Sequence, residues 1–245
     1  MALGDSFTEG VGDPDPSLPN GVRGWADRVA DVLAEATDDF GYVNLAIRGR
    51  KMHQVLDEQV PLALGMRPDL VTIYAGGNDI MRPSVDLDAL VEAYDASLGS
   101  LAGTGARLVV FTAFDPAGFP IFSTGRGRFA VYNELVREVA ERHEATLVDF
   151  WRMREYRDPR LWAEDRLHMS SAGHQRMAIA VLDALEVQHE LRPHELIDRP
   201  TLTGAQRWAA NREWARTHAG PWIKRRLTGT SSGDSLSPRW PSYER

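Results

Sequence analysis

The sequence predicts an α/β protein in which a central parallel sheet carries helices on both faces. Short runs of β-branched and aromatic residues alternate along the chain with longer stretches whose apolar residues recur at the helical period. Each short run is apolar throughout, as expected of strands that are covered on both faces. Strands that alternate with helices in this way are typical of a parallel sheet.

The expected elements follow one another in a regular order from the N-terminus. Residues 1–3 form a first strand that is unusually short, since strands commonly have about five residues. We therefore expect the natural start of the protein to lie upstream of Met1. Further strands are expected at residues 42–45, 70–74, 108–111 and 146–148. Helices are expected at residues 25–36, 52–64, 87–101, 129–143 and 172–187.

The C-terminal part of the chain has a different composition. The sequence predicts a main domain at residues 1–190, a helical extension packed on it at residues 191–227, and a disordered tail at residues 228–245. Thr203, followed three residues later by Gln206, predicts a capped helix within the extension. The apolar surface that this extension can bury comes from Trp208, Trp214 and Trp222. The tail is rich in Gly, Ser, Pro and Arg, which is typical of disorder.

Composition and charge exclude several classes of protein. With 28 Lys+Arg against 35 Asp+Glu, the formal net charge of −7 argues against general nucleic-acid binding, which needs a basic surface. The chain has no cysteine, so disulfides, thiolate metal sites and a cysteine nucleophile are excluded. No apolar run approaches the roughly 18 residues of a membrane span, and no signal peptide is visible. The sequence therefore predicts a cytoplasmic protein.

Four short segments carry candidate chemistry, and each follows a strand or precedes a helix. The segments are Gly4-Asp5-Ser6, Asn44-Leu45-Ala46-Ile47-Arg48-Gly49, Gly76-Gly77-Asn78-Asp79 and Asp165-Arg166-Leu167-His168. The carboxyl ends of parallel strands lie along one edge of the sheet, where ligands bind at the point at which the strand order reverses. We therefore expect these segments to converge although they are far apart in the sequence.

The residue types in these segments suit acyl transfer. Ser6 needs a base to become a nucleophile, and His168 is the candidate base. Asp165 lies three residues earlier, where it can orient the imidazole and stabilise its protonated form. The backbone N–H groups of Ser6 and Gly49 and the side-chain amide of Asn78 can stabilise an oxyanion. Candidate substrate-binding residues that flank the site are Met81, Arg82 and Met169.

In these four segments, taken in order, the chain strongly resembles the SGNH hydrolases, also called GDSL esterases and lipases, whose letters name the Ser, Gly, Asn and His. The resemblance extends over roughly residues 1–188. It implies a three-layer, flavodoxin-like α/β/α fold and hydrolysis of small-molecule carboxylic esters or thioesters through an acyl-serine, without cofactor or metal. It assigns Ser6, Asp165 and His168 to a catalytic triad and Ser6, Gly49 and Asn78 to an oxyanion hole.

Other functions remain open at this point. The same acyl-serine could pass its acyl group to an alcohol, as in an acyltransferase, or act on a carbohydrate as an O-acetylesterase. Asp5, Asp79, Asp165 and His168 could instead hold metal ions in a phosphoesterase, although the Asp-x-His pairs that such sites often contain are absent from the sequence. A non-enzymatic binding module on the same scaffold is disfavoured, because none of the catalytic positions has been replaced.

Overall fold

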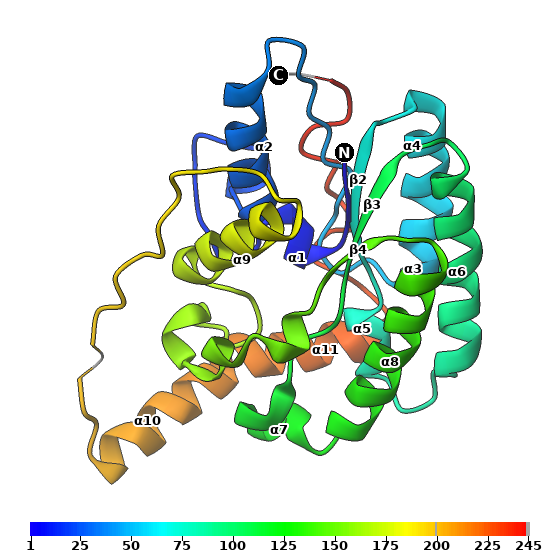
Figure 1. Cartoon of the computed structure of the whole chain (residues 1–245). Helices are drawn as coiled ribbons and strands as arrows, with labels where there is room; N and C mark the ends of the chain where they lie inside the picture. The colour runs from blue at the N-terminus through cyan, green and yellow to red at the C-terminus, as the bar shows by residue number, and fades with distance from the viewer. Residues whose placement is uncertain (199, 244–245) are drawn as a thin grey trace.

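Strands and helices alternate in the computed structural model to give a three-layer α/β/α arrangement (Figure 1). The structure describes residues 1–198 and 200–243. The strands are β1 (Ala2–Gly4), β2 (Leu70–Tyr74), β3 (Arg107–Phe111) and β4 (Thr146–Val148). They form one parallel sheet in the order β1-β2-β3-β4, with Leu3 opposite Ile73 and Val110 opposite Leu147.

The strand expected at residues 42–45 is reduced to a single parallel bridge between Asn44 and Ala2. The segment nevertheless runs beside β1, because the Ala2 N–H donates to the Val43 carbonyl at 2.8 Å and the Leu45 N–H to the Ala2 carbonyl at 2.9 Å. Residues 43–45 therefore lie on one side of β1, and β2 lies on its other side. This reversal at β1 is the place where open α/β sheets bind ligands.

Helices cover both faces of the sheet. They are α1 (Ser6–Glu9), α2 (Trp25–Ala36), α3 (Met52–Gln54), α4 (Val60–Met66), α5 (Gly77–Ile80), α6 (Leu87–Ala102), α7 (Pro120–Ser123), α8 (Arg126–Arg142) and α9 (Ser171–Ala184). On one face α2 packs with α9, and on the other α6 packs with α4 and α8. Successive residues of β3 alternate between these two cores: Leu108 and Val110 face α6 and α8, whereas Val109 and Phe111 face α2 and α9.

The helix expected at residues 52–64 is interrupted. A π-helical turn at Val55–Gln59 separates α3 from α4, whose second residue is Pro61. Proline has no N–H and cannot donate a hydrogen bond to the preceding turn. The wider π-helical turn before Pro61 accommodates the missing hydrogen bond. The turn also directs the buried Gln59 toward β1, which matters for the site described below.

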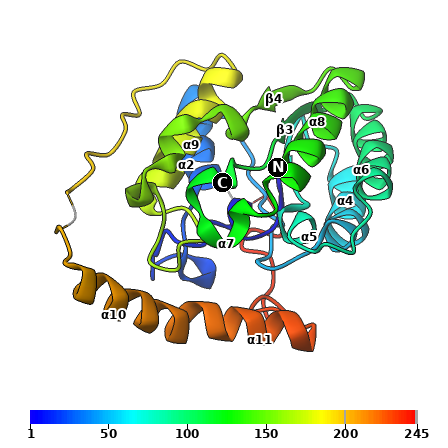
Figure 2. The ribbon, with the colours of Figure 1, turned by 90° about the horizontal axis from the view of Figure 1, so that it is seen from below.

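The helix that Thr203 and Gln206 predict within the extension begins at Gly204 and continues to Thr228. It comprises α10 (Gly204–Trp214), a π-helical turn (Ala215–Ala219) and α11 (Gly220–Thr228), which together form one long segment across the outside of the body (Figure 2). Trp214 and Trp222 are partly buried, but Trp208 is 66% exposed, contrary to the expectation that all three pack inward. The domain boundaries themselves stay predictions. None of the helices within the described residues is long and apolar enough to cross a membrane.

The tail departs from its predicted disorder. Residues 229–243 are placed against the body, while 244–245 lie outside the described residues. Arg239 is buried and forms an ion pair with the buried Asp27 at 2.7 Å, and the Trp240 N–H donates to the Asn44 carbonyl. Composition predicts order only from the apolar surface that a segment can bury. It could not anticipate a segment held by one buried guanidinium and by backbone hydrogen bonds.

Candidate active site

A cavity of about 70 Å³ lies at the carboxyl edge of the sheet, and the predicted residues Ser6, Asn78 and His168 line it together. Met81 and Met169 also line this cavity, as expected of substrate-contacting residues. Aromatic side chains that the sequence analysis did not single out for the site complete the wall: Phe7, Tyr74, Phe150 and Trp162. Side chains from three distant parts of the chain therefore meet where the strand order reverses.

Three of the predicted residues do not line this cavity, and one of them is Asp165, which instead contacts the His168 imidazole. Among the described residues, neither Gly49 nor Arg82 lines this cavity. Gly49 has a positive φ of 80°, and a Cβ there would overlap the Ser231 hydroxyl, so the C-terminal segment covers this turn. Ser231 belongs to a Gly-x-Ser-x-Gly sequence at residues 229–233, but its hydroxyl donates to the Arg48 carbonyl at 3.0 Å. This hydrogen bond ties the C-terminal segment to the turn that contains Gly49.

The position of Ser6 follows from the two residues before it. The carboxylate of Asp5 caps α1 by accepting the Phe7 N–H at 3.0 Å. Gly4 has φ 146°, and a Cβ at this position would lie 2.4 Å from the Tyr74 carbonyl oxygen, so only glycine fits the close approach of β1 to β2. These constraints fix the backbone from which the Ser6 hydroxyl projects.

Gln59 adds a clamp on the same backbone. Its side-chain oxygen accepts the Gly4 N–H at 2.8 Å, and its side-chain nitrogen donates to the Gly4 carbonyl at 2.9 Å. The sequence analysis missed this residue. The available signal was a glutamine on the apolar face of a helix, among Val55, Val60 and Ala63.

Asp165 and His168 form the carboxylate–imidazole pair that the sequence predicts. His168 Nδ1 lies 2.6 Å from Asp165 Oδ2, and Asp165 Oδ1 accepts the backbone N–H groups of Leu167 and His168, both at 3.0 Å. Burial opposes ionisation of this carboxyl, but these hydrogen bonds outweigh it and hold the pKa of Asp165 below its usual range. A carboxylate that stays ionised can keep the imidazole oriented with its other nitrogen free to act.

Asn78 reaches the cavity from α5, where Gly76 starts the turn with φ 92°. A Cβ at Gly76 would lie 2.7 Å from the Tyr132 hydroxyl, so this turn packs too closely for any side chain. Asn78 Nδ2 donates to Asp5 Oδ2 at 3.1 Å and to the Arg50 carbonyl at 3.0 Å. The amide is therefore held between the serine segment and the turn that contains Gly49.

Asp5 is a buried acid directly beside Ser6. Burial is the largest influence on it and raises the pKa of Asp5 from 3.8 to about 7, although the Phe7 N–H and the nearby His168 oppose the rise. A carboxyl group in this range exchanges its proton near neutral pH. The hydrogen bond that Asp5 accepts from Asn78 therefore changes strength across that range.

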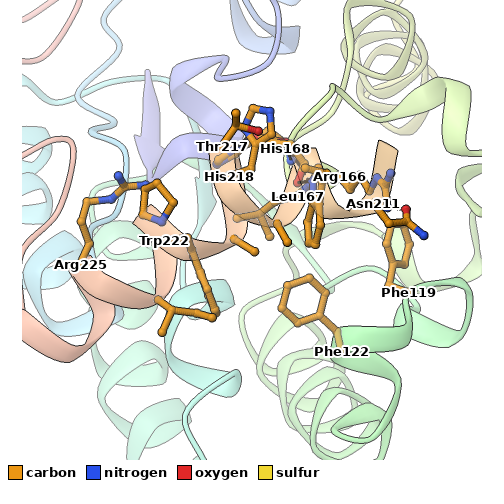
Figure 3. A pocket seen from close by; sticks show the side chains of 16 residues that line it. Phe119, Phe122, Arg166, Leu167, His168, Asn211, Thr217, His218, Trp222 and Arg225 are labelled. Atoms are coloured by element: carbon orange, nitrogen blue, oxygen red, sulfur yellow. Dashed lines mark hydrogen bonds and ion pairs between the residues drawn. The ribbon is translucent and has the colours of Figure 1, made fainter. Parts of the chain in front are cut away.

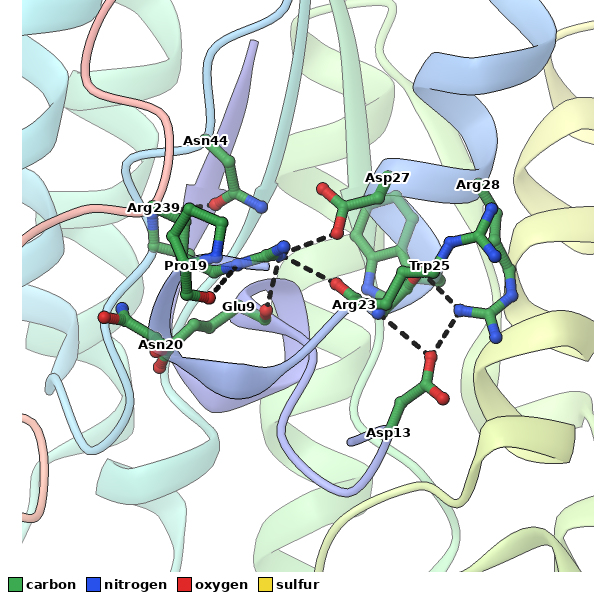
Figure 4. A network of polar contacts seen from close by, with 12 residues as sticks. Glu9, Asp13, Pro19, Asn20, Arg23, Trp25, Asp27, Arg28, Asn44 and Arg239 are labelled. Carbon is green, nitrogen blue, oxygen red and sulfur yellow. Dashed lines mark hydrogen bonds and ion pairs between the residues drawn. The ribbon is translucent and has the colours of Figure 1, made fainter. Parts of the chain in front are cut away.

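Glu9 and Asp13 are both buried and each forms an ion pair, and Figure 4 shows the pair of Asp13 with Arg28. Glu9 is fully buried, and the backbone N–H and Nε of Arg48 donate to its Oε2 at 2.6 and 2.9 Å. Asp13 pairs with the buried Arg28 and accepts the Gly24 N–H. Glu9 thereby links α1 to the turn at Gly49.

Metal ligation was the basis of one alternative. Within residues 1–198 and 200–243, no group of three or more His, Asp or Glu side chains is arranged to hold a metal ion. Asp79 is instead tied to the fold, because it accepts the Met52 N–H at 2.8 Å, and burial raises its pKa. The geometry favours acid–base and nucleophilic chemistry around Ser6 and His168.

The parallel sheet, with this cavity at its switch point, defines a three-layer α/β/α hydrolase. The chain belongs to the GDSL-like lipase/acylhydrolase family, which it matches over residues 2–176. It is therefore an ester hydrolase of the SGNH type, and the resemblance drawn from the four sequence segments is confirmed. The helical extension and the tail lie outside the matched region.

Solved structures with the same fold include several esterases. LAE5, an alpha/beta hydrolase enzyme from the metagenome of Lake Arreo, is 25% identical with a TM-score of 0.63, over 77% of this chain and 95% of that one. Axe2, an acetylxylan esterase from Geobacillus stearothermophilus, is 23% identical with a TM-score of 0.62, over 76% of this chain and 93% of its own. TesA is 21% identical with a TM-score of 0.62, and the match covers 76% of this chain and 96% of the TesA chain. No curated protein matches this chain.

Proposed function

We propose that this protein hydrolyses carboxylic esters through a covalent acyl intermediate on Ser6. His168 takes the proton from the Ser6 hydroxyl while the Ser6 oxygen forms a bond to the ester carbonyl carbon. His168 then delivers this proton to the alkoxide as the bond between the carbonyl carbon and the alcohol oxygen breaks. Water, activated by the same imidazole, releases the acid in the second half of the reaction.

The charge that develops on the carbonyl oxygen needs donors that are already in place. In this proposal the Ser6 N–H and the Asn78 side chain supply two of them, and the Gly49 N–H supplies a third. Both N–H bonds of Asn78 have acceptors, in Asp5 and Arg50, so an oxyanion must share the amide with one of them.

One observation carries the proposal. Ser6 and His168 line the same cavity, and the Nδ1 of that imidazole lies 2.6 Å from the partly buried carboxylate of Asp165. Ser6→Ala is expected to lower kcat for p-nitrophenyl acetate by roughly four to six orders of magnitude, because a triad acts as a unit. A fluorophosphonate probe should label the wild-type protein on the peptide that contains Ser6 and should leave the variant unlabelled.

Ser17→Ala is a matched control, since Ser17 is exposed and its hydroxyl donates only to Asp15. Its turnover should equal that of the wild type. Near-normal turnover by Ser6→Ala would refute the assignment of the nucleophile. Loss of activity in EDTA, restored by a divalent metal, would favour the phosphoesterase alternative over the acyl-serine.

A further inference from the structure

A second, larger cavity adjoins the proposed active site. It has a volume of about 460 Å³ and lies between the body and the long helical segment of residues 204–228, which we call the roof helix (Figure 3). This volume falls within the range of about 300–1,000 Å³ that is typical of small-molecule sites. The roof helix lies outside residues 2–176, the region that matches the family.

The roof helix is attached to the body on both sides of the cavity. On one side the Trp214 Nε1–H donates to the Asp165 carbonyl at 3.1 Å, and Arg166 lies 4.8 Å over the Trp214 ring. On the other side Arg226 donates to the Met81 carbonyl, and Trp222 packs edge-on against Phe122 with ring centroids 6.2 Å apart. The roof helix is thus joined to the two segments that carry the His168 imidazole and the Asn78 amide.

The large cavity and the small one share two residues, Leu167 and His168. Ser6 and Asn78 line only the small cavity, whereas Asp165 and the roof helix line only the large one. The imidazole therefore stands at the boundary between a small space that contains the nucleophile and a large space beneath the roof helix.

This division separates the two halves of an ester. The acyl carbon bonds to Ser6 and its oxygen faces Asn78, so the acyl group occupies the small cavity. The leaving oxygen takes its proton from His168, so the alcohol half lies on the imidazole side. A volume of about 70 Å³ is comparable to that of a few water molecules, which suits an acetyl group better than a long acyl chain.

The lining of the large cavity indicates which alcohol it accepts. Aromatic and aliphatic side chains form most of its wall, with Phe119, Phe122, Trp222 and Ile223 among them. Polar or charged residues also line it, namely Asp165, Arg166, His168, Asn211, Thr217, His218 and Arg225. We propose that this cavity is the subsite for the alcohol half and that the preferred substrates are short-acyl esters of bulky, apolar alcohols. The inference rests on the proposed acyl-serine mechanism and adds to it the orientation and the size of both halves.

Two isomeric esters test the orientation on the wild-type protein. 2-Phenylethyl acetate carries the phenyl group on the alcohol, whereas methyl 3-phenylpropanoate carries it on the acyl group. We expect kcat/KM to be at least about tenfold higher for the acetate, as differential burial of an apolar group commonly gives. Equal values, or a preference for the propanoate, would overturn the proposal. A higher kcat/KM for triacetylated methyl xyloside than for 2-phenylethyl acetate would also overturn it, because the cavity would then accept a polar alcohol.

A substitution in the roof helix tests the place of binding. Ala219 lines the large cavity, and Ala219→Trp fills part of it. The ratio of kcat/KM for 2-phenylethyl acetate to that for ethyl acetate should fall at least about tenfold. Ala210→Trp, at an exposed position of α10 that does not line the cavity, should leave this ratio unchanged. An unchanged ratio in Ala219→Trp, with the fold intact by circular dichroism, refutes the subsite.

The two proposals fail in different ways. If the wild-type protein hydrolyses neither ethyl acetate nor either isomer, and the serine probe does not label it, the acyl-serine mechanism itself is wrong and the subsite falls with it. If ethyl acetate is hydrolysed but the isomers do not differ, only the assignment of the large cavity is wrong.

Discussion

Arg239→Met removes a guanidinium group that lies inside the protein between α1 and α2 (Figure 4). The side chains of Arg239 and Asp27 are both fully buried in an ion pair of 2.7 Å, and Arg239 also donates to the carbonyls of Glu9 and Arg23. Removing one partner of a buried pair costs about 3–5 kcal/mol. For a protein of this size each kcal/mol shifts Tm by about 2–4 °C, so we expect a fall of roughly 6–20 °C.

Thermal unfolding followed by circular dichroism measures this effect. Arg192→Met is the control, because Arg192 is 77% exposed and lies 3.6 Å from an almost fully exposed Glu190, a kind of pair that contributes about 0–1 kcal/mol. The double variant Asp27→Asn/Arg239→Met should recover part of the loss, since the interior then holds no uncompensated carboxylate there. A shift below 2 °C in Arg239→Met, equal to the control, would refute the view that this ion pair holds the C-terminal segment.

Two further predictions concern the site and its support. His174 is buried and neutral, because its Nδ1 accepts the Trp25 N–H and its Nε2 donates to the Val11 carbonyl. Burial lowers the pKa of His174 from 6.5 to about 4, so stability that is complete above pH 6.5 should be lost on acidification to pH 4, by on the order of 3 kcal/mol. Urea unfolding of His174→Gln across this window should show a flatter pH dependence than the wild type, and parallel curves would contradict the assignment. Asn78→Ala should lower kcat for p-nitrophenyl acetate by roughly 100- to 1,000-fold with little change in KM, because the amide acts on developing charge. A change confined to KM would assign Asn78 to substrate binding alone.

The layers of the fold could be predicted from the sequence because their signals are local. Continuous apolar runs such as residues 70–74 and 108–111 became β2 and β3, and the helical period at residues 25–36 became α2 with the same bounds. The strand at residues 42–45 was not kept as such, since the short β1 offers it only a few partners.

Part of the site was also predictable from local signals in the sequence. Ser6, Asn78 and His168 lie at strand ends or helix entries, where a parallel sheet brings distant segments to one edge. Gln59 and the Glu9–Arg48 pair were not found, because a buried polar residue is recognisable only by its partner. Those partners lie 55 and 39 residues away in the chain.

By itself the sequence determined the three layers, the order of the catalytic segments along the chain and the family, all of which depend on residue type and spacing. Only the tertiary structure decided what surrounds His168. The α10 half of the roof helix has no apolar face and the tail has little to bury, so periodicity and composition do not say where on the main domain either of them lies. Their positions are fixed by long-range contacts, from Trp214 to the Asp165 carbonyl and from Arg239 to Asp27. Such contacts form only after the sheet and its helices have brought both partners together.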